Sequence, residues 1–299
     1  MKHLIKTLAC QAVILIFLPL QANCSPIDVF VSIPPIKWLC DQVGGKLVEP
    51  HVLVNKGQDP HSFEPTPRQT VFLSSSKLFF SVGMSFEKRI AIKLKDISKQ
   101  LQWIDISQGI RRIPMDANGH SHNLTNDHDS LDPHIWLSPL NLKLMATNIA
   151  KAMIELDPTN RIYYQQNLQR VSHKLDQLHS SIKKELAPYR GTAIYVFHPA
   201  FGYFTNTYHL KQKSVELDGK KPTPKQLAFL IRKARSSGVK TLFVQPQFDP
   251  KSAAAIATAI DGKVVSLDPL GEDPEFNLQL MSATIKEAIQ LQQQTETSP

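Results

Sequence analysis

The chain has 299 residues, which is long enough for two domains of ordinary size. Hydrophobic residues make up 42% and charged residues 20%, a composition that indicates a globular protein and excludes a disordered one. The net charge is +8, but the basic residues form no dense stripe interleaved with aromatic side chains, so a nucleic-acid-binding protein is not expected.

The first 24 residues have the pattern of a secretory signal peptide. Lys2 and Lys6 give a positive start, and the apolar segment 8–20 that follows is too short to span a bilayer comfortably. We therefore expect an exported protein, in the periplasm or elsewhere outside the cytoplasm. Cys24 stands where a lipoprotein signal would place its modified cysteine. A lipid anchor at Cys24 and ordinary cleavage near this point both remain open.

From residue 26 the chain alternates strand-like and helix-like segments. Runs of β-branched and apolar residues are followed by helical segments that begin at Pro and end at Gly. Strands are predicted over residues 28–33, 48–54, 78–82 and 101–106, and helices over 34–43, from 67 onward, and over 84–94. This order is typical of a parallel sheet covered by helices on both faces.

The middle of the chain contains a polar loop and a long helix. Segment 116–129 is rich in Asn, Gly, Ser and His and predicts a loop, and a helix is expected from Pro139 to about residue 155. Segment 160–186 has no Pro or Gly, and its apolar residues recur at spacings of three, four and seven. It predicts one amphipathic helix about 40 Å long, either a rigid connector between two lobes or a cover on one sheet.

The strand–helix alternation then restarts. Strands are predicted over residues 193–197, 214–217, 241–245 and 263–267, and helices over 200–208, 224–237, 250–260 and 274–293. We therefore predict an α/β protein with two parallel-sheet lobes joined by one long rigid helix. The predicted units are a signal peptide (1–24), an N-terminal lobe (26–157), the connecting helix (158–188) and a C-terminal lobe (189–299).

Four good metal donors follow predicted strands or tight turns: His61, His134, His198 and Asp268. The two earlier histidines each end an Asp-Pro-His tripeptide, in which Pro fixes φ and Asp can hydrogen-bond the following backbone. Such a turn holds the next side chain in a defined direction. His198 and Asp268 directly follow strands, and ligands of open parallel sheets bind beyond the carboxyl ends of the strands. Two donors precede the long helix and two follow it, so both lobes can face one crevice.

Three neutral imidazoles and one carboxylate suit Zn²⁺ in tetrahedral geometry. The same donors accept Mn²⁺, Fe²⁺ or Cu²⁺. A lone His at a strand end is more often a satisfied polar residue, and an Asp before Pro is usually only a turn residue. The repeated turn and the matched strand ends favour a metal site, but from this pattern alone the alternatives stay open.

The chain resembles the metal-binding solute-binding proteins of bacterial ABC importers, the group specific for zinc, manganese or iron (solute-binding protein family 9). The likeness runs in order over essentially the whole mature chain and includes the long helix. The matching segments are Asp59-Pro60-His61 with Phe63-Glu64-Pro65-Thr66-Pro67, Asp132-Pro133-His134-Ile135-Trp136-Leu137-Ser138-Pro139, His198-Pro199-Ala200-Phe201-Gly202-Tyr203-Phe204 and Leu267-Asp268-Pro269-Leu270-Gly271.

This resemblance implies that His61, His134, His198 and Asp268 are the metal ligands, and that a monomeric protein delivers the ion to an ABC transporter membrane permease. Family members with a carboxylate at the third ligand position resemble manganese or iron carriers. This chain has His198 there, so the resemblance favours zinc, with manganese or iron as the alternative.

Two departures from the zinc members of this family stand out. Their long His-rich loop is reduced here to His120, His122 and His128, for which we expect either a weak auxiliary role in collecting metal or no role beyond a solvated loop. Cys40 is the last cysteine in the chain, so the disulfide that zinc members often carry in the second lobe is not expected.

Glu64 and Trp136 are candidates to support the site from behind its ligands. Glu64 could hydrogen-bond a ligand or the backbone, and in a catalytic protein it would be the general base. A structural role is favoured because Pro65 and Pro67 indicate a rigid turn. Trp136, together with Phe63, is expected to pack around the site and keep it dry.

Three functions compete: a metal-binding transport protein, a zinc hydrolase and a surface adhesin. A catalytic zinc usually keeps an open position for water, which four protein donors would close. The chain also lacks a His-Glu-x-x-His helix. We therefore expect a binding protein that is not an enzyme, and nothing in the sequence marks an adhesive face.

Because the connecting helix restricts hinge motion, we expect only a small closure on binding.

Overall fold

The structure is a computed structural model that describes residues 25–94, 98–115, 131–216, 225, 228, 231–232, 235–236, 238–247 and 250–297. The predicted signal peptide with Cys24, and the loop with His120, His122 and His128, lie outside the described residues. Among the described helices none is long and apolar enough to cross a membrane.

The N-terminal lobe is built on a four-stranded parallel sheet in the order β2-β1-β3-β4. Its strands are β1 (Ile27–Val31), β2 (Val48–Val52), β3 (Leu78–Ser81) and β4 (Gln102–Asp105). Its crossover helices are α1 (Pro34–Gly44), α2 (Pro67–Ser75) and α3 (Ser85–Leu94). The first two begin at Pro, and α2 has a capping box between Thr66 and Gln69. The predicted parallel sheet of this lobe is confirmed.

The C-terminal lobe repeats this topology in a second parallel sheet, with the order β6-β5-β7-β8. The strands are β5 (Ala193–Val196), β6 (Lys211–Ser214), β7 (Thr241–Val244) and β8 (Lys263–Ser266). Helices of the described part of this lobe include α6 (Gly202–Tyr208), α8 (Pro250–Ala259) and α9 (Pro274–Thr297). In both sheets the strand order reverses beside the first strand, and binding sites of such sheets form at this point.

The predicted position of β6 was wrong by three residues. The strand covers Lys211–Ser214 and not 214–217. Its sequence is Lys-Gln-Lys-Ser, which carries no apolar pattern. The strand lies at the edge of the sheet, where one side of the backbone ladder has no neighbouring strand and polar side chains are tolerated. The more apolar residues that follow it therefore gave a misleading signal.

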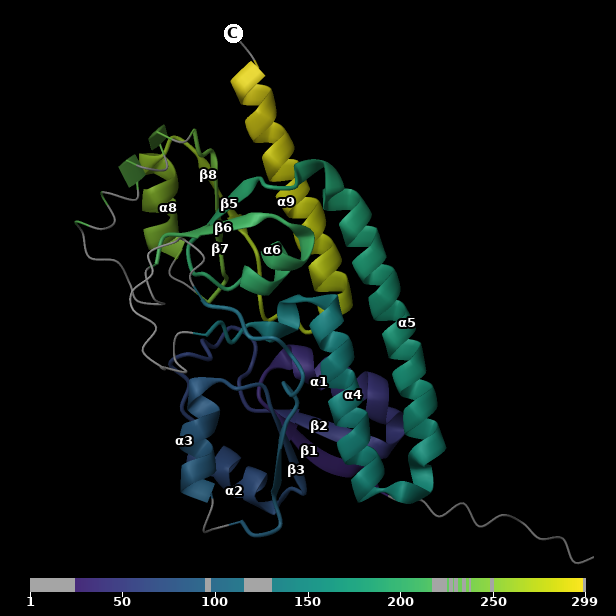
Figure 1. The fold of residues 1–299 in the computed structure, drawn as a ribbon. Coiled ribbons are helices and arrows are strands. Elements are labelled where there is room, and N and C mark those ends of the chain that lie inside the picture. Colours follow the sequence, from purple (N-terminus) through teal and green to yellow (C-terminus); the bar gives the residue numbers. More distant parts are fainter. Residues whose placement is uncertain are drawn as a thin grey trace, which may run out of the picture.

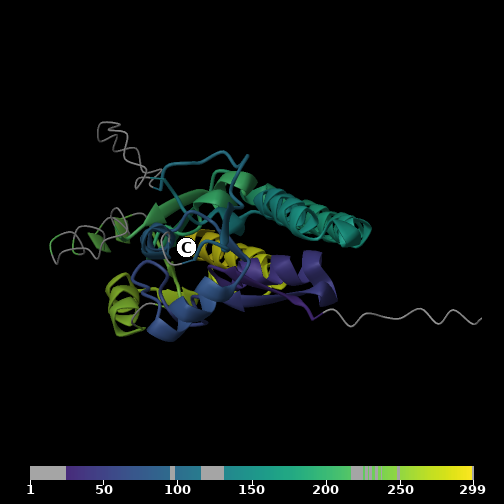
Figure 2. The ribbon, with the colours of Figure 1, turned by 90° about the horizontal axis from the view of Figure 1, so that it is seen from below.

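Helix α5 (Arg161–Leu186) joins the two lobes, as predicted for the long helix. Its 26 residues span about 39 Å. Its buried stripe packs against α1 and α4 (Pro139–Leu156) of the N-terminal lobe, and against α6 and α9 of the C-terminal lobe. Figure 1 shows α5 running along one side of both lobes, and from below α4 and α5 lie together at one edge of the molecule (Figure 2).

One hydrophobic core extends through both lobes. It includes Phe30 and Phe80 from the first sheet, Leu175 from α5, and Phe243 and Leu278 from the second lobe. A smaller cluster lies under α8. Short 3-10 turns complete the fold: η1 (Gly45–Leu47), η3 (Ile135–Leu137), η4 (Pro158–Asn160) and η5 (Ala187–Tyr189). Because interiors of this kind are close-packed, the lobes are joined by packing as well as by chain.

Candidate metal site

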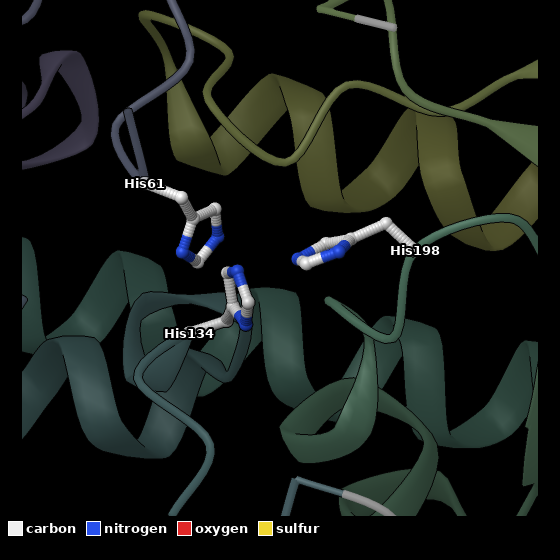
Figure 3. A group of neighbouring side chains, drawn as sticks. All are labelled: His61, His134 and His198. Atoms are coloured by element: carbon white, nitrogen blue, oxygen red, sulfur yellow. The ribbon is translucent and has the colours of Figure 1, made fainter. Parts of the chain in front are cut away.

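Three histidines converge between the two lobes. His61 lies in the loop after β2, His134 directly precedes η3, and His198 follows β5. One ring nitrogen from each lies within 4.8 Å of those of the other two. The ring centroids are 5.4 Å apart for His61 and His134, 4.9 Å for His61 and His198, and 5.3 Å for His134 and His198. Figure 3 shows the three rings facing one another from three separate segments.

Three Asp-Pro turns surround this cluster. In each of them the Oδ1 atom of Asp accepts a hydrogen bond from the backbone N–H two residues on, at 2.9 Å. The turns are Asp59-Pro60-His61, Asp132-Pro133-His134 and Asp268-Pro269-Leu270. The predicted Asp-to-backbone bond is confirmed in both Asp-Pro-His segments. These turns fix the direction of the neighbouring side chains within three consecutive residues.

Two of the histidines bind a buried carboxylate through Nδ1. His134 Nδ1 lies 2.7 Å from Asp132 Oδ1, and His198 Nδ1 lies 2.7 Å from Glu216 Oε2. Both acids are at most 1% exposed. A carboxyl oxygen that carries no proton can only accept hydrogen bonds, and Asp132 Oδ1 already accepts the backbone N–H of His134. Such an oxygen places the proton of each neutral ring on Nδ1 and leaves the Nε2 lone pair for a cation. This is the arrangement that orients histidine ligands of metal ions.

Burial sets the charge of this site. His61 is exposed as a residue, but loss of water around its ring, together with the neighbouring His134 and His198, lowers its pKa to about 3. Burial also holds the pKa of His134 well below its usual range, and His198 adds to this effect. Burial raises the pKa of the Asp132 carboxyl to about 8. The His61 and His134 imidazoles are therefore neutral at pH 7 and have lone pairs to offer a metal ion.

The histidines line a small chamber of about 20 Å³. Its walls also include Asp59, Pro60, Trp136, Gln245, Gln247, Pro269 and Leu270. A volume of this size holds about one water molecule or a single ion. Of the described residues, Gln245 and Gln247 each carry a buried Oε1 atom without a hydrogen-bond partner. The chamber therefore has unused polar capacity and a volume that matches a single ion.

Asp268 lies beside the chamber but outside the group of three mutually close histidines. Its Oδ1 atom accepts hydrogen bonds from Gln247 Nε2 and from Leu270 N, both at 2.9 Å. Its own carbonyl oxygen accepts from Asn277 Nδ2 of α9 at 2.7 Å. The two residues that donate to Oδ1, Gln247 and Leu270, both line the chamber. Asp268 is thus held rigidly at the edge of the site, and its role as the fourth ligand stays a prediction.

Trp136 and Glu64 have different surroundings. The Trp136 ring is 1% exposed, lies edge-to-face with His134 at 5.4 Å, and donates from Nε1 to the carbonyl oxygen of Pro269 at 2.6 Å. Trp136 therefore contacts a histidine of the cluster and forms part of the chamber wall. The Glu64 carboxylate is 57% exposed and pairs with Arg89 and Lys93 of α3, at 3.0 Å and 3.4 Å. Its contacts thus anchor the loop after His61 to α3.

Three residues that contribute to the site were not singled out in the sequence. Glu216 follows the edge strand β6, whose position was predicted wrongly, so its proximity to His198 was hidden. Gln245 and Gln247 follow β7, and Gln245 donates from Nε2 to the carbonyl oxygen of His198 at 2.9 Å. The only sequence signal for them was their place at the carboxyl end of a strand, where binding residues gather.

The fold and the site together define a class of protein: two parallel-sheet α/β lobes, joined by one long helix, with a histidine cluster at the boundary between them. The family described as zinc-uptake complex component A, periplasmic, matches residues 29–290. The chain belongs to this family, in agreement with the resemblance seen in the sequence.

Known relatives and structures agree with this assignment. The high-affinity zinc uptake system protein ZnuA of Paracoccus denitrificans is 29% identical over 278 residues, which cover 81% of this chain and 83% of the relative. The manganese ABC transporter substrate-binding lipoprotein PsaA of Streptococcus pneumoniae is 28% identical over 228 residues, covering 72% and 71%. A crystal structure of ZnuA superposes with a TM-score of 0.80 at 36% identity, covering 88% of this chain and 98% of that one.

Proposed function

We propose that this protein captures one divalent transition-metal ion, most favourably Zn²⁺, outside the cytoplasm and delivers it to an ABC import permease. The observation that carries this proposal is the convergence of His61, His134 and His198 within 4.8 Å around a chamber the size of one ion. Two of these histidines come from the N-terminal lobe and one from the C-terminal lobe. An ion bound by all three would link the lobes.

The proposed ligands are one nitrogen from each of His61, His134 and His198, and a carboxylate oxygen of Asp268. Three nitrogen donors and one oxygen donor match the tetrahedral preference of Zn²⁺. Mn²⁺ favours oxygen donors, so His198 at the third position supports zinc. A manganese or iron carrier is the alternative, since one relative is named as a manganese-binding protein.

We further propose that the protein is not an enzyme. A hydrolytic zinc site needs an open coordination position and room for a substrate beside it. The chamber of about 20 Å³ has room for an ion but not for an ester or peptide group. A hydrolase would show metal-dependent turnover that is abolished by His198→Ala. An adhesin would bind a host ligand even after all four proposed donors are removed.

The proposed transport role also implies how the protein is exported, how it is anchored and how far its lobes move. A monomer exported by residues 1–24, either free or anchored through Cys24, would capture the ion, close slightly, and present it to the permease. The continuous core between the lobes supports a small movement rather than a wide hinge.

Elemental analysis tests the identity of the ion. The mature protein would be purified without chelator or affinity tag, and we expect close to one zinc per chain. In titration calorimetry with Zn²⁺, His61→Ala and His134→Ala should each lower the affinity at least tenfold, or about 1.4 kcal/mol. His51→Ala is the matched control, because His51 pairs with Asp28 on β1. Unchanged zinc affinity in both site variants would overturn the proposed ligand set.

A further inference from the structure

Gln247 makes a contact that the Asp-Pro turns themselves do not require. Its Nε2 atom donates to Asp268 Oδ1, an atom that already accepts the backbone N–H of Leu270. In the other two turns the second partner of the Asp side chain is local: Ser62 for Asp59, and the His134 ring for Asp132. Gln247 instead lies 21 residues away, beyond the end of β7.

The orientation of the Gln247 amide follows from its partner. A carboxylate oxygen only accepts hydrogen bonds, so the amide nitrogen must face Asp268. Each carboxylate oxygen has about two lone-pair sites. The two bonds from Gln247 and Leu270 both end on Oδ1 and fill its capacity, and neither ends on Oδ2. A cation that approaches Asp268 would therefore find lone pairs on Oδ2 alone.

Other contacts of Asp268 do not depend on Gln247. The backbone N–H of Leu270 stabilises the turn, and Asn277 of α9 holds the carbonyl oxygen of Asp268. Loss of Gln247 would leave this backbone in place while it returned a lone pair to Oδ1. The contact thus acts on how the carboxylate can coordinate, and not on where the residue lies.

We propose that Gln247 is a positioning residue that restricts Asp268 to coordination through one oxygen and thereby favours Zn²⁺ over Mn²⁺. This inference rests on the proposed function, with Asp268 as the fourth ligand. One-oxygen coordination completes a set of four donors, which suits Zn²⁺. Two-oxygen coordination would add a fifth donor and a second oxygen, which suits ions such as Mn²⁺ that favour oxygen-rich, higher coordination.

The test compares Gln247→Met and Gln247→Ala with the wild-type protein. The methionine variant keeps a side chain of similar length but cannot donate, and the alanine variant opens the contact completely. We expect both to keep zinc affinity within several-fold, while the ratio of the Mn²⁺ to the Zn²⁺ dissociation constant falls about tenfold or more, the size of change that residues behind metal ligands produce. Gln100→Met is the control, because Gln100 is exposed and bonds the carbonyl oxygens of Ser74 and Ser75.

Co²⁺ provides a readout that a purely structural role would not change. Four-coordinate Co²⁺ absorbs visible light strongly, and five-coordinate Co²⁺ absorbs more weakly. We expect strong visible bands for the wild-type protein and for Gln100→Met, and weaker bands for both Gln247 variants.

The outcomes separate this inference from the proposed function. If the wild-type protein does not bind Zn²⁺, or if Asp268→Ala leaves zinc affinity unchanged, the ligand set fails and the inference fails with it. If Asp268→Ala weakens zinc binding but both Gln247 variants keep the wild-type metal ratio and Co²⁺ spectrum, only the role of Gln247 is overturned. Equal loss of both metals in the two variants would also overturn it, since that result marks a structural contact.

Discussion

The indole N–H of Trp136 donates a hydrogen bond to the carbonyl oxygen of Pro269, 133 residues away and 2.6 Å distant. The bond crosses from the N-terminal lobe to the C-terminal lobe. It also joins the segment that carries His134 to the turn that carries Asp268. The two lobes are thus tied directly behind the proposed metal site.

We expect Trp136→Phe to destabilise the protein and to speed metal release. The substitution leaves the buried carbonyl oxygen of Pro269 without this donor, which costs about 1–3 kcal/mol. Thermal melts of the metal-free protein would measure the first effect, and stopped-flow release of Zn²⁺ to a chelator the second. Trp38→Phe, on α1, controls for the change of ring. Wild-type stability and release rate in Trp136→Phe would show that this bond contributes nothing.

Asp132→Asn and Glu216→Gln should each weaken Zn²⁺ binding roughly 10- to 100-fold, the usual effect of losing the carboxylate behind a histidine ligand. An amide can present N–H groups to Nδ1 of His134 or His198, and the ring proton would then move to the nitrogen needed by the metal. Calorimetric titration measures the loss. Asp157→Asn is the matched control, because Asp157 accepts hydrogen bonds from Tyr164 and Asn160 at the turn between α4 and α5 and is not among the residues that line the chamber. Equal affinities in all three variants would contradict this role.

Glu87 should make stability depend on pH independently of the metal. Its carboxyl is 2% exposed and accepts hydrogen bonds from Ser32 and from the backbone N–H groups of residues 82–84. Burial raises its pKa to about 7. Because the folded state holds the proton more tightly than the unfolded state, stability from this group is present below about pH 4.5 and is lost as the pH rises to about 7.

Glu87→Gln removes this titration, so we expect the stability of the wild-type protein relative to Glu87→Gln to fall by up to about 3 kcal/mol between pH 5 and pH 8. Urea unfolding of the metal-free proteins at several pH values measures the difference. Glu49→Gln, at an exposed position of β2, should show no such trend. A constant difference between wild type and Glu87→Gln would mean that the buried acid keeps an ordinary pKa.

Metal binding should leave the overall dimensions of the protein nearly unchanged. The shared core and α5 hold the lobes together in the metal-free chain. Small-angle scattering with and without Zn²⁺ should give closely similar radii of gyration. A clear compaction would show that the lobes separate widely before the ion binds.

Much of the fold could be predicted because local patterns agree with the tertiary structure. Strands such as β3 are apolar on both faces, and prolines mark the starts of α1, α2 and α4. The long helix was evident from a stripe that α5 does bury. The edge strand β6 was misplaced because its neighbours on one side are absent and its sequence is polar.

The histidines of the site could also be predicted, because His61 and His134 each end an Asp-Pro-His turn and His198 follows a strand. Glu216, Gln245 and Gln247, which support the site from outside these motifs, could not. Glu216 and Gln247 act on residues 18 and 21 positions away, through pairings that only the second sheet creates. A buried acid or amide in a short polar segment looks the same in sequence whether it braces a ligand or not.

The three Asp-Pro turns have a consequence for how this protein can vary. Each turn fixes its backbone through a hydrogen bond between residues two positions apart, so the course of these segments depends little on the packing under the sheets. Changes in the packing under the sheets can therefore make the protein sturdier or more fragile without altering which ion it prefers. Substitutions in the core can therefore change the stability of the fold, while substitutions in the turns and their partners change which ion is bound.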